Sequence, residues 1–416
     1  MTGRVHIIGA GLAGLSCGVR LAERGVPVTL YESAQHAGGR CRSFHDEAMG
    51  CRIDNGNHLM MSGNRATMDY LDLIGAQGTL AGPARAEFPF LDTVSGRRWT
   101  VRPNAGPIPW WILVHGRRVP RASVQSYLQG IRFLFAGKNH TVADCLDMHT
   151  ILFRRFWEPF VVAALNADPE EASARLMAPV VMETFARGEK ACRPRLVREG
   201  LSESLIDPAL DYIQRHGGLV QMGARLRGLN MDGDRIGALD IAGQDPVALG
   251  PGDAVVLAVP PAPAADLVPG LTVPRGNRAI VNAHFRLDGP PKEPTLMGII
   301  GRTAQWIFQR GNVVSVTVSA ADLLAEETNE EIANRIWPEV TRIIGLGQAP
   351  LPAHRVVKEK RATFAQIPSE VQRRPGTVTN WSNLYLAGDW TDTGLPATIE
   401  GAIRSGAKAA GLAMPA

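Results

Sequence analysis

The sequence predicts an α/β fold built on a doubly wound parallel sheet, assembled from discontinuous segments and accompanied by a second, α+β domain. Observations at the two ends of the 416 residues carry this prediction. Residues 5–32 follow the order strand, glycine-rich turn, helix and strand, and residues 383–406 read as a strand, a loop and a helix. Further strands are expected between them, within 217–226 and 253–260.

The N-terminal segment carries a dinucleotide-binding pattern. Its first strand, residues 5–8, runs into a G-x-G-x-x-G turn that opens a helix, and the next strand ends in an acidic residue. The first glycine permits the tight turn, the second lets backbone approach a pyrophosphate, and the third lets helix and strand pack closely. The acidic residue is placed to bind ribose hydroxyls. The cofactor-binding residues predicted in this segment are Gly9, Gly11, Ala13, Gly14 and Glu32.

A second glycine pair distinguishes a flavin from a nicotinamide cofactor. Gly38, Gly39 and Arg40 follow Glu32 within a few residues, and such a turn with a guanidinium suits a diphosphate cofactor in an extended pose. Together with the first turn, it resembles the FAD-binding start of the amine oxidase and carotenoid desaturase superfamily. The FAD is expected to be non-covalent, because no cysteine lies beyond Cys192. Since the chain has no second G-x-G-x-x-G motif, we expect an external electron donor.

The C-terminal segment supplies the other half of the predicted cofactor site. A strand runs into Gly388 and Asp389, and a loop then leads to a helix that begins near Pro396. In the superfamily, the equivalent aspartate lies on the ribityl-phosphate side of the flavin and this helix start faces the pyrimidine edge. The free N–H groups of a helix start suit the negative charge of a reduced flavin. The residues assigned here are Gly388, Asp389, Ala397 and Thr398, together with Leu226, whose position lies over the adenine in the superfamily.

The candidate catalytic residues lie in the loop Asp54-Asn55-Gly56-Asn57-His58. In relatives this loop passes near the flavin ring, so Gly56 and Asn57 are assigned to cofactor binding. Asp54 and His58 are the candidate proton donors, and the alternative for each is that it only fixes the loop.

Residues 93–143 contain eight basic side chains and no acidic one. Among them lie the paired tryptophans Trp110 and Trp111 beside aliphatic residues. This combination suits the headgroup boundary of an anionic bilayer, where each basic residue contributes about 1 kcal/mol. The alternative is a core helix with a solvated basic face. We therefore expect peripheral membrane contact through roughly residues 97–138, and we expect no nucleic-acid binding because no binding module accompanies the charges.

Composition limits the class of protein. Hydrophobic residues make up 45% and charged residues 20% of the chain, as in ordinary globular proteins. No apolar run approaches the roughly 18 residues of a membrane-spanning helix. The five cysteines include no C-x-x-C pair, which argues against a disulfide framework and a structural zinc site, so no metal is expected. With no secretory leader apparent, the expected location is cytoplasmic and peripherally membrane-associated.

Three runs together resemble the squalene-associated FAD-dependent desaturase family, a branch of the same superfamily. They are the 54–58 loop, the stretch 157–176 and the run 386–401. The resemblance implies a glutathione-reductase-like variant of the Rossmann fold. It also implies a long isoprenoid substrate and the reductive dehydroxylation of hydroxysqualene to squalene in hopanoid biosynthesis, with hydride transfer from reduced FAD.

Other activities of the superfamily are the alternatives. A carotenoid or phytoene-type desaturase, or an amine oxidase, would use oxidised FAD on a different substrate. A non-enzymatic prenyl-lipid carrier would have lost FAD binding, whereas here both glycine-rich phosphate-binding elements are intact.

The same reasoning divides the chain into two interleaved domains. The FAD-binding domain is expected from residues 1–63, 200–261 and 375–416. The substrate domain is expected from residues 64–199, mostly helical, and 262–374, rich in sheet.

Overall fold

A computed structural model, which describes residues 3–289 and 292–414, contains a five-stranded sheet built from distant parts of the chain. Its spatial order is β10 (Leu219–Met222), β2 (Val28–Glu32), β1 (Val5–Ile8), β14 (Ala254–Leu257) and β20 (Leu384–Leu386). All four pairings are parallel. This order, in which later strands add on both sides of β1, is that of a doubly wound sheet, so the predicted fold class is confirmed.

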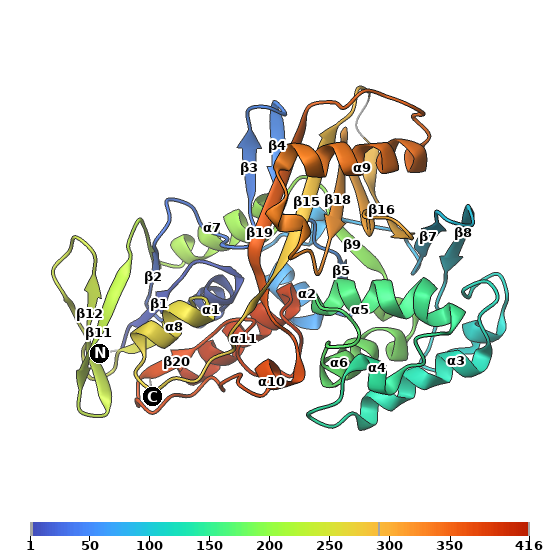
Figure 1. Cartoon of the computed structure of the whole chain (residues 1–416). Coiled ribbons are helices and arrows are strands. Elements are labelled where there is room, and N and C mark those ends of the chain that lie inside the picture. The colour runs from blue at the N-terminus through green and yellow to red at the C-terminus, as the bar shows by residue number, and fades with distance from the viewer. Residues whose placement is uncertain (1–2, 290–291, 415–416) are drawn as a thin grey trace.

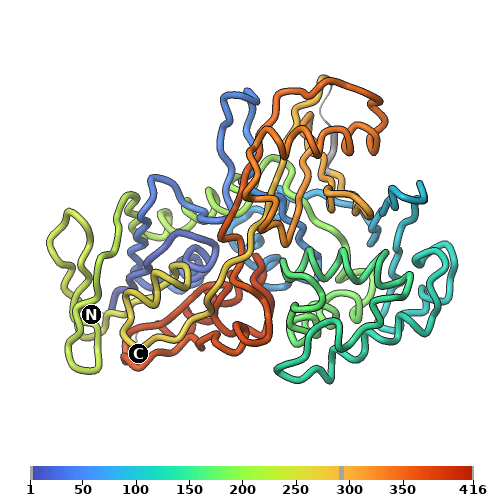
Figure 2. The backbone as a smooth tube through the Cα atoms, in the orientation of Figure 1, coloured from blue at the N-terminus to red at the C-terminus, as the bar shows by residue number. Residues whose placement is uncertain are grey.

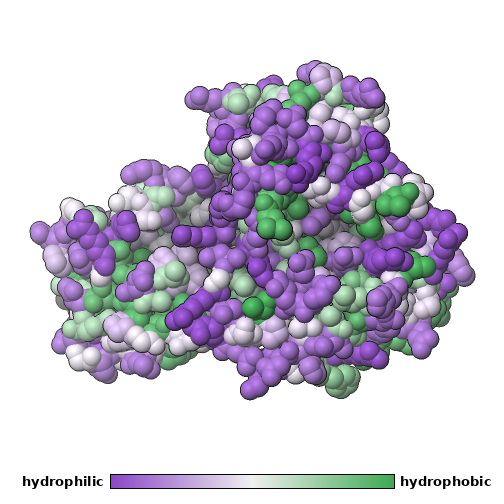
Figure 3. Space-filling view, viewed as in Figure 1, coloured by the Kyte–Doolittle hydropathy of each residue, from purple (hydrophilic) through white to green (hydrophobic). Residues whose placement is uncertain are grey.

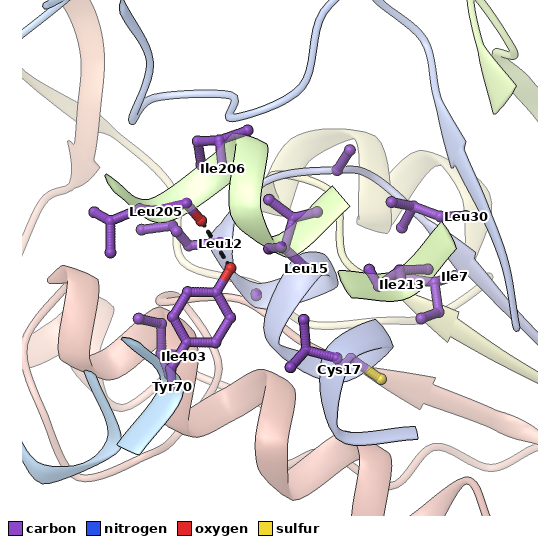
Figure 4. Close-up of a cluster of buried hydrophobic side chains, with 14 of the residues drawn as sticks. Ile7, Leu12, Leu15, Cys17, Leu30, Tyr70, Leu205, Ile206, Ile213 and Ile403 are labelled. Atoms are coloured by element: carbon purple, nitrogen blue, oxygen red, sulfur yellow. Dashed lines mark hydrogen bonds between the residues drawn. The ribbon is translucent and has the colours of Figure 1, made fainter. Parts of the chain in front are cut away.

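Four helices from distant parts of the chain pack together in the core beside this sheet. They are α1 (Leu12–Glu23), α2 (Arg65–Leu73), α7 (Asp207–Arg215) and α11 (Ile399–Leu412). The blue start and the red end of the chain therefore run next to each other in Figure 2, and Ser16 Oγ donates to the Ile403 carbonyl at 2.8 Å. In the core shown in Figure 4, the Tyr70 hydroxyl of α2 donates to the Leu205 carbonyl at 2.8 Å. This core thus extends beyond the expected boundary at residue 63, and the domain boundaries stay predictions.

A seven-stranded sheet forms the upper lobe in Figure 1 and reaches toward the helical lobe on the right. Its order is β19 (His354–Phe364), β15 (Asn277–Arg286), β18 (Val313–Val318), β17 (Trp306–Gly311), β16 (Lys292–Ile300), β7 (Phe88–Asp92) and β8 (Arg97–Val101). Helix α9 (Asn329–Ile344) covers one face of this sheet, and Val281, Ala283 and Phe285 of β15 pack against the helix. Because side chains alternate along a strand, Asn282 and His284 point to the other face, and both are buried.

The helical lobe on the right of Figure 1 contains α3 (Val124–Leu128), α4 (Val142–Cys145), α5 (Glu158–Leu165) and α6 (Ala174–Glu183). Its core holds an aromatic cluster of Phe133, Phe156, Trp157, Phe160 and Phe185. No helix within the described residues is long and apolar enough to cross a bilayer. The remaining helices and strands are β3 (Ser43–Asp46), β4 (Cys51–Asp54), β5 (Met60–Met61), β6 (Leu80–Ala81), β9 (Pro194–Val197), β11 (Leu226–Asp232), β12 (Arg235–Ile241), β13 (Val247–Ala248), α8 (Pro261–Leu267) and α10 (Pro368–Val371).

Candidate functional site

The three glycines of the first turn have different surroundings. A Cβ atom on Gly9 would lie 2.6 Å from the Ala258 carbonyl oxygen, and one on Gly14 would lie 1.9 Å from the Gly9 carbonyl oxygen. Gly9 also has a φ of +105°, which favours glycine. A Cβ on Gly11 would meet nothing within 4 Å. Packing therefore requires the outer two glycines, whereas the middle one leaves open space beside the backbone.

That open space lies at the start of α1, where no side chain caps the helix. The first N–H groups of a helix have no partner within it, and together with the helix dipole they attract an anion. Ala13 is buried in this first turn. Open space next to uncapped N–H groups fits the diphosphate of a dinucleotide.

Glu32 holds the turn together from the end of β2. Its Oε2 accepts from the Ala10 backbone N–H at 2.8 Å, and its Oε1 accepts from the Ala34 N–H at 2.9 Å. The Gly38 N–H donates to the Ala10 carbonyl at 2.8 Å, so the second glycine pair lies against the first turn. The Ala224 N–H donates to the Glu32 carbonyl at 2.7 Å, which brings the start of β11, and with it Leu226, to the same edge. The contacts of these residues with a cofactor stay predictions.

Arg40 and Asp389 join the two ends of the chain. Arg40 Nη2 lies 2.7 Å from Asp389 Oδ1 across 349 positions of sequence, and Nη1 donates to the Ala362 carbonyl at 2.7 Å. The Asp389 carboxylate raises the pKa of Arg40. The predicted N-terminal and C-terminal halves of the site thus meet in one place. The role of Arg40 in binding a diphosphate stays a prediction.

The start of α11 is held by a side chain from another segment and by its own capping residue. The Ala397 N–H donates to Oε1 of the buried Gln366 at 2.8 Å, and the Thr398 hydroxyl caps the helix by accepting from the Gly401 N–H at 3.1 Å. The Gly388 N–H donates to Ser405 Oγ at 2.9 Å, which ties the end of β20 to the same helix. The helix start is therefore fixed relative to the sheet.

Arg374 is a residue of this region that the sequence analysis missed. It is 7% exposed, and its guanidinium donates to the carbonyls of Asp389 at 3.0 Å and Leu395 at 2.8 Å. It also donates to the carbonyls of Trp390 and Thr391. One buried side chain therefore organises the loop between β20 and α11, which carries Asp389. No sequence motif marks it, because its partners are mainly backbone carbonyls.

Both oxygens of Asp54 are engaged by protein groups. Oδ1 accepts from the Ser43 hydroxyl at 2.6 Å and from the Leu201 N–H at 3.0 Å, and Oδ2 pairs with Arg310. These contacts match the loop-fixing alternative, and the proton-donor role of Asp54 stays a prediction.

His58 lies in the same loop, where burial lowers its pKa. The neighbouring loop residues contact the seven-stranded sheet: Asn57 Nδ2 donates to Thr317 Oγ1 at 3.0 Å, and a Cβ on Gly56 would lie 3.2 Å from Asn282 Nδ2. The loop thus lies against the seven-stranded sheet. The role of His58 as a proton donor stays a prediction.

The structure adds His284, Arg310 and Ser315 to the candidate site. They line a pocket together with Asp54 and His58. The sequence feature that could have indicated His284 is the alternation of polar and apolar residues over 280–286. This alternation is also typical of an ordinary strand with one solvated face. The sequence does not show that this polar face is covered, and therefore the pocket was not predicted.

The two neighbouring tryptophans, Trp110 and Trp111, differ in their exposure to solvent. Trp110 is 47% exposed, and the Arg117 guanidinium lies 4.9 Å from its ring, whereas Trp111 is 4% exposed and packs edge-on against Tyr127. The expectation that both rings face a membrane is therefore wrong for Trp111. The short 3₁₀ segment of residues 110–113 turns successive side chains to different sides.

Comparison with known proteins identifies close relatives. The sequence profile of the flavin containing amine oxidoreductase family matches residues 12–414. Hydroxysqualene dehydroxylase from Rhodopseudomonas palustris is 49% identical over 416 residues, which cover 100% of this chain and 99% of the relative. Hydroxysqualene dehydroxylase from Sinorhizobium fredii is 45% identical, with 100% and 99% covered.

Solved structures share the fold. An oxidoreductase from Methanosarcina mazei superimposes with a TM-score of 0.74 over 97% of this chain and 99% of that protein, at 13% sequence identity. At this identity the likeness describes the fold alone.

Proposed function

This chain belongs to the flavin-containing amine oxidoreductase family, in the group of the two hydroxysqualene dehydroxylases, and we propose that it converts hydroxysqualene to squalene. The observation that carries this function is an identity of 45–49% over essentially the full length of both relatives. The substrate class is therefore a long isoprenoid lipid.

The residues at the junction of the two chain ends support FAD as the flavin. Two adjacent glycine turns suit a diphosphate in an extended pose, and the open space at Gly11 admits it. We infer non-covalent binding, because no cysteine lies beyond Cys192 and the C-terminal segment therefore offers no thiol to the flavin.

The conversion takes up one hydride and one proton, breaks the C–O bond and releases water. When bound, reduced FAD supplies the hydride to the allylic carbon. The protein positions that carbon and excludes water, which would otherwise capture an allylic cation.

An activity assay separates this function from the alternatives. Photoreduced enzyme incubated with hydroxysqualene is expected to form squalene, whereas oxidised enzyme incubated with phytoene is expected to leave it unchanged. Absence of squalene would rule out the proposed function, and desaturation of phytoene would favour the carotenoid alternative. A purified protein without flavin absorption at roughly 370 and 450 nm would favour the lipid carrier.

Glu32→Ala is expected to weaken FAD retention. The substitution removes the acceptor for the Ala10 N–H and the acceptor predicted for the ribose hydroxyls. We expect a loss of about 1–3 kcal/mol in FAD binding, measured as cofactor occupancy after dialysis. Glu23→Ala, on the exposed end of α1, is the matched control. Equal occupancy in both variants would contradict the assignment of Glu32.

We propose that an anionic bilayer surface docks on the segment 108–135. It holds eight of the seventeen large exposed hydrophobic side chains of the described residues: Ile108, Trp110, Leu113, Val114, Leu128, Ile131, Leu134 and Phe135. On the face shown in Figure 3, hydrophobic residues form small groups among hydrophilic ones. A cleft of about 460 Å³ beside the segment is lined by Arg98, Arg102 and Arg118. Exposed apolar side chains next to arginines match lipid tails and anionic headgroups.

Trp110→Ser combined with Phe135→Ser is expected to reduce binding to vesicles that contain anionic lipid by about tenfold or more, because two large side chains leave the interface. Binding is measured by vesicle sedimentation, and FAD content should not change. Leu323→Ser is the matched control, since Leu323 is 89% exposed but lies outside the segment. Equal sedimentation of the double variant and wild type would rule out this docking surface.

A further inference from the structure

A small pocket with mixed polar and apolar walls lies between the 54–58 loop and the face of the seven-stranded sheet that points away from α9. Its volume is about 30 Å³, enough for a hydroxyl group or a water molecule. His58, His284 and Arg310 contribute polar walls, and Leu196, Phe308 and Val313 contribute apolar walls. The pocket therefore combines a small polar end with hydrocarbon surfaces.

One ring nitrogen of His284 makes no close hydrogen bond within the described part of the chain. The residue is 2% exposed, and its Nδ1 lies 2.7 Å from Ser315 Oγ. Its Nε2 is buried and makes no hydrogen bond of ordinary length and angle with the described residues, and the Asp54 backbone interacts with the ring only weakly, as the smallest of the influences on its pKa. Buried polar atoms nearly always have a partner, so an unpaired one at the wall of a pocket indicates a ligand or a bound water.

The chemistry of the pocket selects a hydroxyl group. Burial lowers the pKa of His284 to about 4, so the ring is neutral at pH 7 and has one donor and one acceptor nitrogen. Whichever role Nδ1 takes toward Ser315, Nε2 takes the other. A hydroxyl group both donates and accepts, and it therefore matches either tautomer.

Arg310 makes the pocket unsuitable for an amine. Its guanidinium pairs with Asp54, which neutralises the nearest carboxylate, and its remaining N–H groups can only donate. An ammonium group would thus meet a cation and no free carboxylate, whereas the oxygen of an alcohol can accept from Arg310.

We propose that this pocket recognises the hydroxyl group of the substrate through His284 Nε2 and Arg310, and that the departing water occupies the same space. The proposal rests on the proposed function, because a dehydroxylase substrate must present a hydroxyl group beside an apolar chain. The apolar walls contact the carbons next to it. His284 is thereby a specificity-determining residue that separates the alcohol from the hydrocarbon product.

The test compares binding of hydroxysqualene and squalene to the oxidised FAD-containing enzyme in detergent micelles, followed by changes in flavin absorption. Wild type is expected to bind the alcohol about tenfold or more tighter than squalene. His284→Leu should lose that preference while its affinity for squalene and its flavin content stay unchanged. His284→Gln, whose amide lies near the position of Nε2, should restore part of the preference.

His354→Leu is the matched control, because His354 lies beside Phe285 at the opposite face of the same sheet, with the two rings tilted against each other. It should keep the full preference. If His284→Leu fails to fold, Ser315→Ala tests the proposal in its place. This variant is expected to lose its preference for hydroxysqualene over squalene several-fold, because His284 Nδ1 loses its partner. The proposed role of the pocket would be overturned by an unchanged preference for hydroxysqualene in a folded His284 or Ser315 variant, or by the absence of this preference in wild type. Wild type that forms no squalene when photoreduced would instead overturn the proposed function.

Discussion

Arg374→Met is expected to cost about 3–5 kcal/mol of stability and most of the bound flavin. The substitution leaves the carbonyls of the loop between β20 and α11 without donors in a buried place, and each unsatisfied group costs about 1–3 kcal/mol. Methionine fills part of the volume, so the missing hydrogen bonds are the main loss. Because the same loop carries Asp389, its rearrangement should also break the Arg40–Asp389 contact. Thermal unfolding and flavin occupancy measure both effects.

Arg373→Met provides the matched control. Arg373 is the preceding residue and carries the same charge, but its side chain is 32% exposed, donates to the Val273 carbonyl and pairs with Glu370. A partly exposed pair of this kind contributes about 1 kcal/mol or less. If the two variants lost similar stability and similar amounts of flavin, the special role of Arg374 would be wrong.

The sequence predicted those parts of the site that depend on local backbone geometry. The turn at Gly9, Gly11 and Gly14 combines a strand end, a helix start and close packing within ten residues, so the residue pattern alone defines it. The parallel sheet followed from the same short patterns. The resemblance to a known family then predicted the reaction, which composition and spacing alone did not.

The parts of the candidate site that the sequence did not predict depend on how distant segments of the chain pack together. His284 becomes part of a pocket only because the 54–58 loop covers its face of the sheet. Arg374 binds backbone carbonyls, which every residue provides, so its partners have no sequence signature. Trp110 and Trp111 are neighbours with the same side chain, and only the local turn exposes one and buries the other.

Gly406→Ala is expected to separate the two halves of the cofactor site. Gly406 lies in α11 where that helix crosses α1, and a Cβ atom there would lie 2.0 Å from the Ala13 carbonyl oxygen and 3.0 Å from the Cys17 nitrogen. The obstructing atoms belong to the backbone of α1, so a helix must move. Overpacking of this kind costs about 1–3 kcal/mol and occasionally more, and the rigid backbone places this variant at the upper end.

The consequence for the site follows from the contact between these helices. The start of α1 lies at the first glycine turn, and the start of α11 is capped by Thr398 beside Ala397. Moving the helices apart should therefore lower FAD affinity as well as the unfolding temperature, and cofactor occupancy measured against free FAD concentration would report it.

Gly411→Ala is the matched control in the same helix. A Cβ at Gly411 meets nothing within 4 Å, and alanine forms helix better than glycine by about 1 kcal/mol. One methyl group added five positions along α11 should thus raise the unfolding temperature slightly, whereas at Gly406 it should lower it and release flavin. If Gly406→Ala were as stable and as yellow as Gly411→Ala, the close approach of α1 and α11 would be wrong. The union of the two chain ends around one flavin would then lose its structural basis.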